Sequence, residues 1–477
     1  MKATEKAYSG GIRRTEHLKV QSKHLLYFLL LSASIMFGLL SVYLDTVLVI
    51  ALILAIIVSI TCLVRPMVGL TAFVILSFLR PADMLPVLEV IPLAKIVGGL
   101  TLLAIILRYI TTRKIVFGNR QMLLLLAFLA TLFISIPFSY WPSESLAISI
   151  DFLKIIIFYF TFVNIIKSLS ALRTISLIAL VSIIIISIST TLSYFSGNAR
   201  GASAIGAGLY GDANDVALIM VTAIPLAGFW EMRRSRGRTG TLLKWVTITI
   251  LIVGIISTGS RGGFLGMVAV LFLYLLSGRN KIVGAVAIVL IALPLVFLIP
   301  SNITQRYSTI GTYEEDASAM GRIYSWQAGL HMMTARPLNG VGAGCFEIAF
   351  GLDFRPAGFN SAKWNAPHNT LIQVGGETGL IGMSVFLYLY ILCISQLRKL
   401  KPIAESREQT RIEDVKKILI TSLIGFGVCA FFLTQAFNFM YYFLVASTVS
   451  LYNLNSGLQK KPIVRTGNET FEENIIL

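Results

Sequence analysis

The stretch Ala366–Gly382, APHNTLIQVGGETGLIG, stands where a long polar segment gives way to an apolar one. His368 is one of four histidines and begins a motif: His368-Asn369, nine residues, then Gly379-Leu380-Ile381-Gly382. Apolar runs recur along nearly all of the 477 residues, of which 56% are hydrophobic and 13% charged, whereas soluble domains have about 25% charged residues. Because the runs are unbroken rather than alternating, we expect an all-α polytopic integral membrane protein.

Each membrane span needs about 20 apolar residues, and we expect about 12–14 transmembrane helices. The predicted spans are 25–44, 47–64, 67–79, 91–109, 121–138, 147–166, 172–195, 213–230, 243–258, 263–277, 282–300, 370–396, 418–435 and 438–455.

The segments between these spans alternate in charge. With the N-terminus in the cytoplasm, every inner segment is basic on balance, whereas the outer segments have few lysines and arginines for their length, as the positive-inside rule requires. The run 25–44 is long for a signal peptide and no clear cleavage site ends it, so we expect an uncleaved first span and two cytoplasmic termini. The net charge of +17 lies mainly in inner segments and tails, which accounts for it without a nucleic acid partner.

These boundaries predict one membrane domain with one outer elaboration. Residues 1–24 form a basic cytoplasmic tail, 25–300 the first group of transmembrane helices, 301–369 a large periplasmic loop, 370–455 the last transmembrane helices, and 456–477 a second cytoplasmic tail. The loop far exceeds an ordinary connector, so we expect it to be functional and ordered, with short helices. Residues Tyr313–Ala335 fit one helix, which Pro337 and the following glycines end, and Gly340–Gly344 reads as a flexible turn.

His368 lies at the predicted outer boundary of the span 370–396. Histidine is the side chain best suited to accept a proton near neutral pH, so His368 is a candidate catalytic base. Asn369, its partner in the motif, is a candidate substrate contact. The alternative is a histidine at a helix start that bonds a neighbouring carbonyl.

Arginines in short outer segments are candidate phosphate ligands. Arg261, in Thr258-Gly-Ser-Arg-Gly-Gly263, must lie near the bilayer surface, where a guanidinium is costly unless it is paired or faces a polar cavity. Its fork geometry suits phosphate oxygens, and the glycines let a backbone approach a ligand closely. Arg200 is the only cation of its outer segment, and Arg80 is a further candidate substrate contact. For Arg261 and Arg200 the alternative is a lipid headgroup contact.

Arg322 and Trp326 lie one helical turn apart, an arrangement that suits sugar stacking or phosphate contact. The alternative is a loop helix that packs within its own domain. Asp215 is a candidate substrate contact, although an acidic residue at a helix N-terminus explains it more simply, and Asp212 reads as a turn residue.

Two further patterns carry less specific information. Asp151 and Lys154 lie three residues apart inside a span and are expected to pair, facing the protein interior. The chain has no metal-ligand spacing and no CxxC among its four cysteines, so we expect no metal, no cofactor and no structural disulfide.

Taken in order, these motifs resemble the bacterial O-antigen ligase family. His368-Asn369 with Gly379-x-x-Gly382 is similar to the family signature, and Thr258–Gly263 to its arginine turn between two spans. The segment from Gly321-Arg322 and Trp326 to Pro337-Leu338-x-Gly340-x-Gly342 and Phe346 is similar to the part before its histidine. Arg200 followed by Gly211–Ala217 resembles an earlier outer loop, with Asp-Ala-Asn-Asp where many members have an Asn-Pro-Asn type of turn. The resemblance covers about residues 190–395.

The resemblance implies a glycosyltransferase that takes a glycan from undecaprenyl pyrophosphate at the outer face of the bacterial inner membrane. The glycan would pass to an acceptor hydroxyl, on lipid A-core or another acceptor, without nucleotide sugar or metal. Arg200 and Arg261 would stabilise the diphosphate leaving group, and His368 would activate the acceptor. Arg322 would be a second diphosphate or glycan contact, and the outer loop would form a lid.

Other functions stay open. An O-antigen or exopolysaccharide polymerase would use the same donor, and a ligase acting on protein is also compatible. A polysaccharide or lipid transporter is less favoured, because transporters show repeated halves and ionisable residues near the bilayer midplane, whereas the candidate residues here gather on the outer side.

Overall fold

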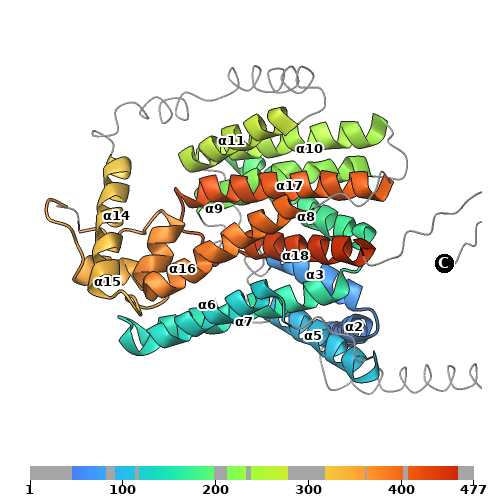
Figure 1. The fold of residues 1–477 in the computed structure, drawn as a ribbon, viewed down its shortest axis with the longest axis horizontal. Helices are drawn as coiled ribbons and strands as arrows, with labels where there is room; N and C mark the ends of the chain where they lie inside the picture. The colour runs from blue at the N-terminus through green and yellow to red at the C-terminus, as the bar shows by residue number, and fades with distance from the viewer. Residues whose placement is uncertain are drawn as a thin grey trace, which may run out of the picture. The chain divides into compact units, whose positions relative to one another are not determined.

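The computed structural model describes residues 46–81, 92–112, 118–197, 212–232, 238–277, 317–359, 362–400 and 407–459. Every regular element in these ranges is a helix (Figure 1). The elements are α2 (Thr46–Val64), α3 (Pro66–Leu79), α5 (Leu93–Thr112), α6 (Arg120–Ser135), η2 (Ile136–Phe138), α7 (Pro142–Ile165), α8 (Leu169–Phe195), α9 (Ala213–Ala223), η4 (Ile224–Met232), α10 (Arg238–Ser257), α11 (Arg261–Ser277), α14 (Ala317–Ala335), α15 (Phe346–Leu352), α16 (Thr370–Lys399), α17 (Arg407–Ala430) and α18 (Phe439–Gln459).

The chain divides into two compact units, Met1–Val64 and Arg65–Leu477. The apolar helix α2 is the described part of the first unit. All packing and all sites considered below lie within the second unit.

The described residues include seven helices that are long and apolar enough to cross a membrane. They are Leu93–Ile110, Arg120–Phe138, Pro142–Ile165, Leu169–Phe195, Ala213–Met232, Arg238–Ser257 and Thr370–Lys399. Large hydrophobic side chains stay exposed along them, such as Ile110 of α5 and Leu192 of α8. The expected all-α polytopic membrane fold is confirmed. The predicted spans 25–44 and 282–300 lie outside the described residues.

The predicted span 438–455 forms α18, whose first half is enclosed by protein. Its residues Met440–Ala446 have no exposed surface, and it packs against α7, α8, α16 and α17. Neighbouring helices shield the polar side chains of its second half, so α18 does not need the apolar surface of a lipid-facing helix.

Small residues bring α11 close to α9 and α17. A Cβ on Gly263 would lie 2.5 Å from Ala217 Cβ in α9, and one on Gly266 would lie 2.3 Å from Cys429 Sγ in α17. Such close approach is the usual way in which membrane helices pack. These contacts fix the start of α11, where Arg261 lies.

The helix α16 is broken at Gly379, whose φ is 71° and ψ −177°. The segment Pro337–Gly344 crosses the break: Leu380 N donates to Pro337 O (2.7 Å), Val341 N to Gly376 O (2.9 Å) and Gly342 N to Glu377 O (3.0 Å). A Cβ on Gly340 would lie 2.4 Å from the Glu377 carbonyl. The interpretation of Gly340–Gly344 as a flexible turn is therefore wrong, because these backbone bonds pack it tightly against α16.

The described part of the predicted outer loop is ordered around its own hydrophobic core. The helix predicted over Tyr313–Ala335 is observed as α14, which ends at Ala335 as expected, with 313–316 outside the described residues. The hydrophobic core of this part of the loop contains Ala328, Met332, Val341, Cys345, Phe346, Ala349, Phe350 and Phe354. Figure 1 shows α14 and α15 beside the first turns of α16.

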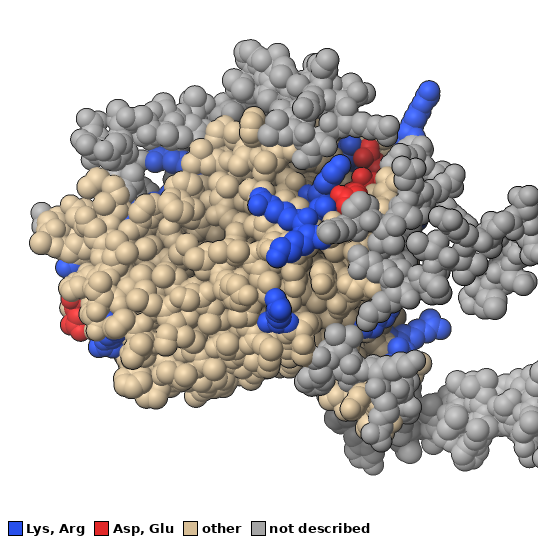
Figure 2. All heavy atoms as spheres, viewed as in Figure 1, with Lys and Arg blue, Asp and Glu red and all other residues tan. Residues whose placement is uncertain are grey.

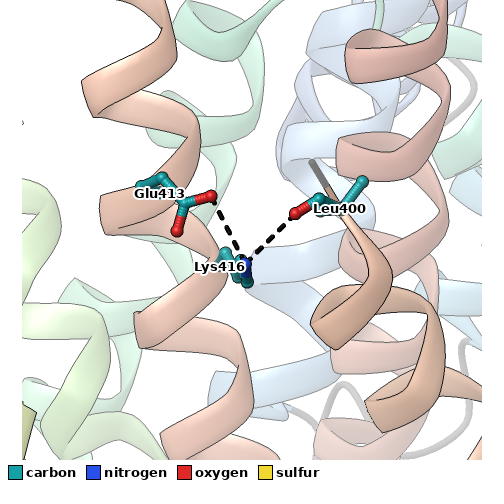
Figure 3. Close-up of polar contacts among 3 residues, drawn as sticks. All are labelled: Leu400, Glu413 and Lys416. Atoms are coloured by element: carbon teal, nitrogen blue, oxygen red, sulfur yellow. Dashed lines mark hydrogen bonds and ion pairs between the residues drawn. The ribbon is translucent and has the colours of Figure 1, made fainter. Parts of the chain in front are cut away.

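Charged side chains mark the two ends of the helices. At the end where α16 finishes, Lys416 Nζ donates to the C-capping carbonyl of Leu400 (3.2 Å) and pairs with Glu413 (3.3 Å), as Figure 3 shows. A cation at a helix C-terminus is favourable. We call this the Lys416 end and the opposite one the His368 end. On the face drawn in Figure 2, charged side chains gather toward these ends and the surface between them is uncharged.

The break in α16 gives a stability prediction. Gly379→Ala should lower stability by at least about 2 kcal/mol, because a left-handed φ disfavours a side chain and the new Cβ would lie 2.6 Å from Pro337 O. The matched control is Gly99→Ala in α5, where nothing lies within 4 Å and alanine favours the helix. Thermal unfolding in detergent should show a drop of several degrees for Gly379→Ala only. Equal midpoints would show that neither the positive φ of residue 379 nor its close approach to the Pro337–Gly344 segment disfavours a side chain there.

Candidate functional site

Three helix N-termini meet at the His368 end. Asp212 caps α9 by accepting from Asn214 N (2.9 Å), and Ser260 Oγ accepts from Gly263 N (3.1 Å) at the start of α11. Asn369 caps α16 by accepting from the N–H groups of Leu371 (2.9 Å) and Ile372 (3.1 Å). The N-terminus of a helix carries a partial positive charge, so such a meeting point favours an anion.

The starts of α9 and α11 are joined by buried side chains. Ser260 Oγ donates to Asn214 Oδ1 (2.7 Å), and Asp215 accepts from the side-chain amide of Gln435. Gln435 Oε1 in turn accepts from Asn438 Nδ2 (2.5 Å). Asp215 lies in the first turn of α9, as the simpler sequence interpretation predicted. It ties α9 to the segment 431–438, which connects α17 to α18.

The same segment holds the start of α16. Thr370 Oγ1 donates to Leu433 O (2.8 Å) and accepts from Gln435 N (3.1 Å). Gln373 Oε1 accepts from Ala436 N (3.0 Å), and Thr434 Oγ1 accepts from His368 N (3.1 Å). The segment 431–438 is therefore the part that positions all three helix starts.

His368 is half-buried and has a φ of 45°. Among the described residues, only His368 and Arg80 combine a side chain with a positive φ. A left-handed backbone costs such a residue on the order of 1 kcal/mol, and this strain is concentrated at functional sites. For Arg80, which ends α3, this is the ordinary geometry of a helix C-terminus. For His368 the positive φ sets the direction in which the chain enters α16.

Arg261 and His368 both lie close to the segment Phe432–Thr434. A Cβ on Gly262, beside Arg261, would lie 3.1 Å from Phe432 Cβ, while His368 N bonds Thr434. Gly262 and Gly263 thus approach Phe432 and Ala217, so protein atoms fill the space in which a ligand was expected to approach them.

Trp326 supports the turn before His368. Its Nε1 donates to Pro367 O (3.1 Å), and its ring meets Phe431 edge to face at 5.5 Å. Arg322, one turn earlier on α14, is half-buried. The structure thus places Trp326 beside His368, and it gives Trp326 and Asn369 structural contacts in addition to their predicted roles in substrate binding.

Arg80 lies in a separate groove, to which the segment 431–438 contributes Phe437. The groove has a volume of 590 Å³, and its lining includes Arg80, Lys95, Asp151, Lys154 and Phe437. The expected Asp151–Lys154 pair is formed, at 3.0 Å, and Lys95 joins it at 3.3 Å. The carboxylate faces this groove and is half-exposed, so it is not enclosed in the protein interior as expected.

Of the predicted site residues, Arg200 lies outside the described residues. Within the described ranges, no three His, Cys, Asp or Glu side chains come together in a way that could hold a metal ion.

An anchor holds the outer elaboration to the turn between α6 and α7. Tyr140 Oη donates to Asp353 (2.5 Å), and Arg336 donates to Phe138 O (2.8 Å) with its guanidinium 4.7 Å from the Tyr140 ring centre. Burial and the Asp353 hydrogen bond raise the pKa of Tyr140 to about 12. The phenol therefore stays protonated, and remains a donor, throughout the physiological range.

Sequence reasoning missed the residues that organise the site. Thr434, Gln435 and Asn438 stand between two apolar runs, and polar residues in so short an outer segment were a usable signal. Glu377 was also missed: it is fully buried before the break in α16, and the Gly344 N–H and the Gln373 side chain bond its carboxyl. Gly344 is distant from Glu377 in sequence, so only the fold reveals that contact.

Comparison with known proteins gives consistent matches. Residues 246–387 match the O-antigen ligase family. Two relatives named "putative polysaccharide ligase", from Rickettsia felis and Rickettsia conorii, are each 25% identical over 34% of this chain. The matches cover 45% and 40% of these relatives, so the chain spans less than half of their length. The resemblance to the O-antigen ligase family is therefore confirmed over residues 246–387, the part of this membrane protein that contains Arg261, Arg322, Trp326, His368 and Asn369.

Proposed function

We propose that the protein is an O-antigen ligase-type glycosyltransferase, which moves a glycan from undecaprenyl pyrophosphate to an acceptor hydroxyl. One observation carries the proposal: Arg261 and His368 both lie close to the segment Phe432–Thr434, where the N-termini of α9, α11 and α16 meet. Arg261 and His368 also lie inside the region that matches the O-antigen ligase family.

The proposed reaction needs a base and an anion site at one place. The acceptor oxygen attacks the anomeric carbon, and the bond from that carbon to the diphosphate oxygen breaks. The hydroxyl proton passes to the imidazole of His368, and the lipid diphosphate leaves with the electron pair. Arg261, whose fork matches phosphate oxygens, and the helix N-termini stabilise the developing charge. Arg200 is proposed as a second diphosphate ligand.

The remaining candidates support this centre. Arg322 is proposed to contact diphosphate or glycan from α14, and Trp326 and Asn369 to contact substrate while they hold the turn at His368. Asp215 is proposed to orient the segment 431–438 through Gln435, and the outer elaboration to cover the site as a lid. The leaving group is already activated, so the proposed transfer uses neither nucleotide sugar nor metal.

The proposed location is the bacterial inner membrane, with the His368 end at the periplasmic face and both termini in the cytoplasm. The apolar helices support a membrane location. The basic residues of the inner segments support the orientation.

A transfer assay tests the proposal and separates it from the polymerase alternative. Purified protein is mixed with an undecaprenyl-pyrophosphate glycan, with and without lipid A-core, in the absence of ATP and added metal. We expect the glycan to move onto the core in one step. A ladder that grows on undecaprenyl without core would instead identify a polymerase. No product with folded protein would contradict both functions.

Arg261→Lys should lower the transfer rate about 100-fold, because lysine keeps the charge but loses the bidentate fork. The matched control is Arg238→Lys, the same change at the first residue of α10, at the Lys416 end. Both variants should insert and purify like the parent protein. Near-normal turnover of Arg261→Lys would remove Arg261 from the diphosphate site.

His368→Asn should lower the transfer rate about 100-fold or more, since it removes the general base. Asparagine tolerates a positive φ better than alanine, so it separates chemistry from backbone strain. His368→Ala should show the same loss of rate together with lower stability. Donor binding, measured with radiolabelled lipid, should persist in both variants. If donor binding disappears, His368 belongs to the diphosphate site instead.

Asn369→Asp should preserve stability but weaken donor binding, with KM for the donor raised about fivefold. Aspartate keeps the helix cap, because it accepts the same two N–H groups, but it places a negative charge where the diphosphate binds. Asn119→Asp is the matched control, since Asn119 caps α6 at the opposite end by accepting from Met122 N. Unequal thermal midpoints, or equal donor KM values, would contradict the anion site.

A further inference from the structure

The groove that contains Arg80 is separate from the site at His368 but shares a wall with it. Its 590 Å³ lie between the His368 ends of α3, α5 and α7 and the segment that leads into α18. Phe437 and Phe439 line it, whereas Thr434 and Gln435, a few residues earlier, hold His368 and Asp215. The segment 431–438 thus has one contact surface in each site.

The polar lining of this groove lies on helices that cross the membrane. Lys95 is on α5, and Asp151 and Lys154 are on α7, both of which are membrane-spanning helices. Charged side chains in such helices are costly and usually face a water-filled or functional cavity. Asp151 contacts both lysines, so among the described lining residues of α5 and α7 two lysines face one carboxylate and leave a net positive charge.

The rest of the lining is apolar and aromatic. It includes Phe73, Leu76, Phe152, Ile155, Phe437 and Phe439. A positive groove with such walls fits an amphiphile that carries a phosphate group on a hydrophobic anchor. A soluble sugar would leave the aromatic walls exposed, and a neutral lipid would leave the cations without a counterpart.

We propose that this groove binds the acceptor, as a phosphate-bearing amphiphile, and presents its glycan to His368 across the segment 431–438. The inference rests on the proposed function, because a transferase must hold two substrates and Arg261 is already proposed to serve the donor outside this groove. Both acceptor types share this chemistry: lipid A-core carries phosphates, and a lipid-linked repeat carries a diphosphate.

Kinetics with both substrates test the proposal. Lys154→Gln and Lys95→Gln should each raise KM for the acceptor about tenfold, the effect of one lost charge-assisted contact. The donor KM should change less than twofold. Asp151→Asn should act in the opposite direction and lower KM for the acceptor, because it leaves both lysines without their counter-charge. If the ion pair were merely structural, all three substitutions would instead change the KM for the acceptor in the same direction.

The control is Arg65→Gln, which removes one cation at the opposite end of α3 and should leave both KM values unchanged. Each variant is assayed with lipid A-core, with a lipid-linked repeat, and with dephosphorylated core, which should abolish the differences between variants. A rise in donor KM for the lysine variants would make the groove a donor site, and unchanged KM values would overturn the proposal.

Direct binding separates failure of this inference from failure of the proposed function. Purified protein is titrated with a synthetic lipid monophosphate in detergent, and with the same lipid without phosphate, and followed by native mass spectrometry. We expect phosphate-dependent binding that Lys154→Gln weakens and Arg65→Gln preserves. Such binding without any transfer would count against the proposed reaction but not against the anion-binding groove. Equal binding by all variants would contradict the proposed phosphate site in the groove, even if transfer occurs.

Discussion

The hydrogen bonding of the segment 431–438 is the constraint on which the rest of the structure depends. This segment connects two helices at the membrane boundary, where backbone groups without partners are costly. Thr370 and Gln373, at the start of α16, bond backbone groups of this segment. Thr434, within the segment, bonds the backbone N–H of His368. Because one short segment bonds to α9 and α16 and packs on α11, the three helix starts cannot move independently. A site made from their N–H groups is therefore preorganised.

The break at Gly379 performs the corresponding task further along α16. An unbroken helix would have no donors to offer Pro337 O and would satisfy its own carbonyls at Gly376 and Glu377. The break exposes them, and the Pro337–Gly344 strap uses them. The outer elaboration is thereby fastened to the bundle through backbone bonds on one side and through Tyr140, Arg336 and Asp353 on the other. The glycines of Gly340–Gly344 and Gly379 serve this one junction, which explains their presence without reference to a ligand.

Much of this was predictable where the information is local. The helix start at Thr370, the end of α14 before Pro337 and the position of Asp215 follow from caps, prolines and helix dipoles within a few residues. The bond between Gln435 and Asp215 joins residues 220 positions apart, and no local pattern indicates it. The prediction of a flexible turn at Gly340–Gly344 was wrong for a similar reason. Glycines suggest a flexible backbone until the carbonyls that they approach are known. The groove also escaped notice, because Lys95 and Asp151 lie on different helices and only packing brings them to one cavity.

The two sites that contact the segment 431–438 have complementary properties. At the first, helix N-termini and Arg261 provide a compact positive site that suits a diphosphate leaving group. In the groove, Lys95 and Lys154 are partly neutralised by Asp151 and stand among aromatic walls, which suits a bulkier amphiphile held less tightly. Two lipid-anchored substrates each bring a hydrophobic chain that must remain in the bilayer. A division between two sites that share one wall lets both chains stay in lipid while the reacting groups meet beside His368. Under the proposed function, the segment that orders the helices is also the partition between donor and acceptor.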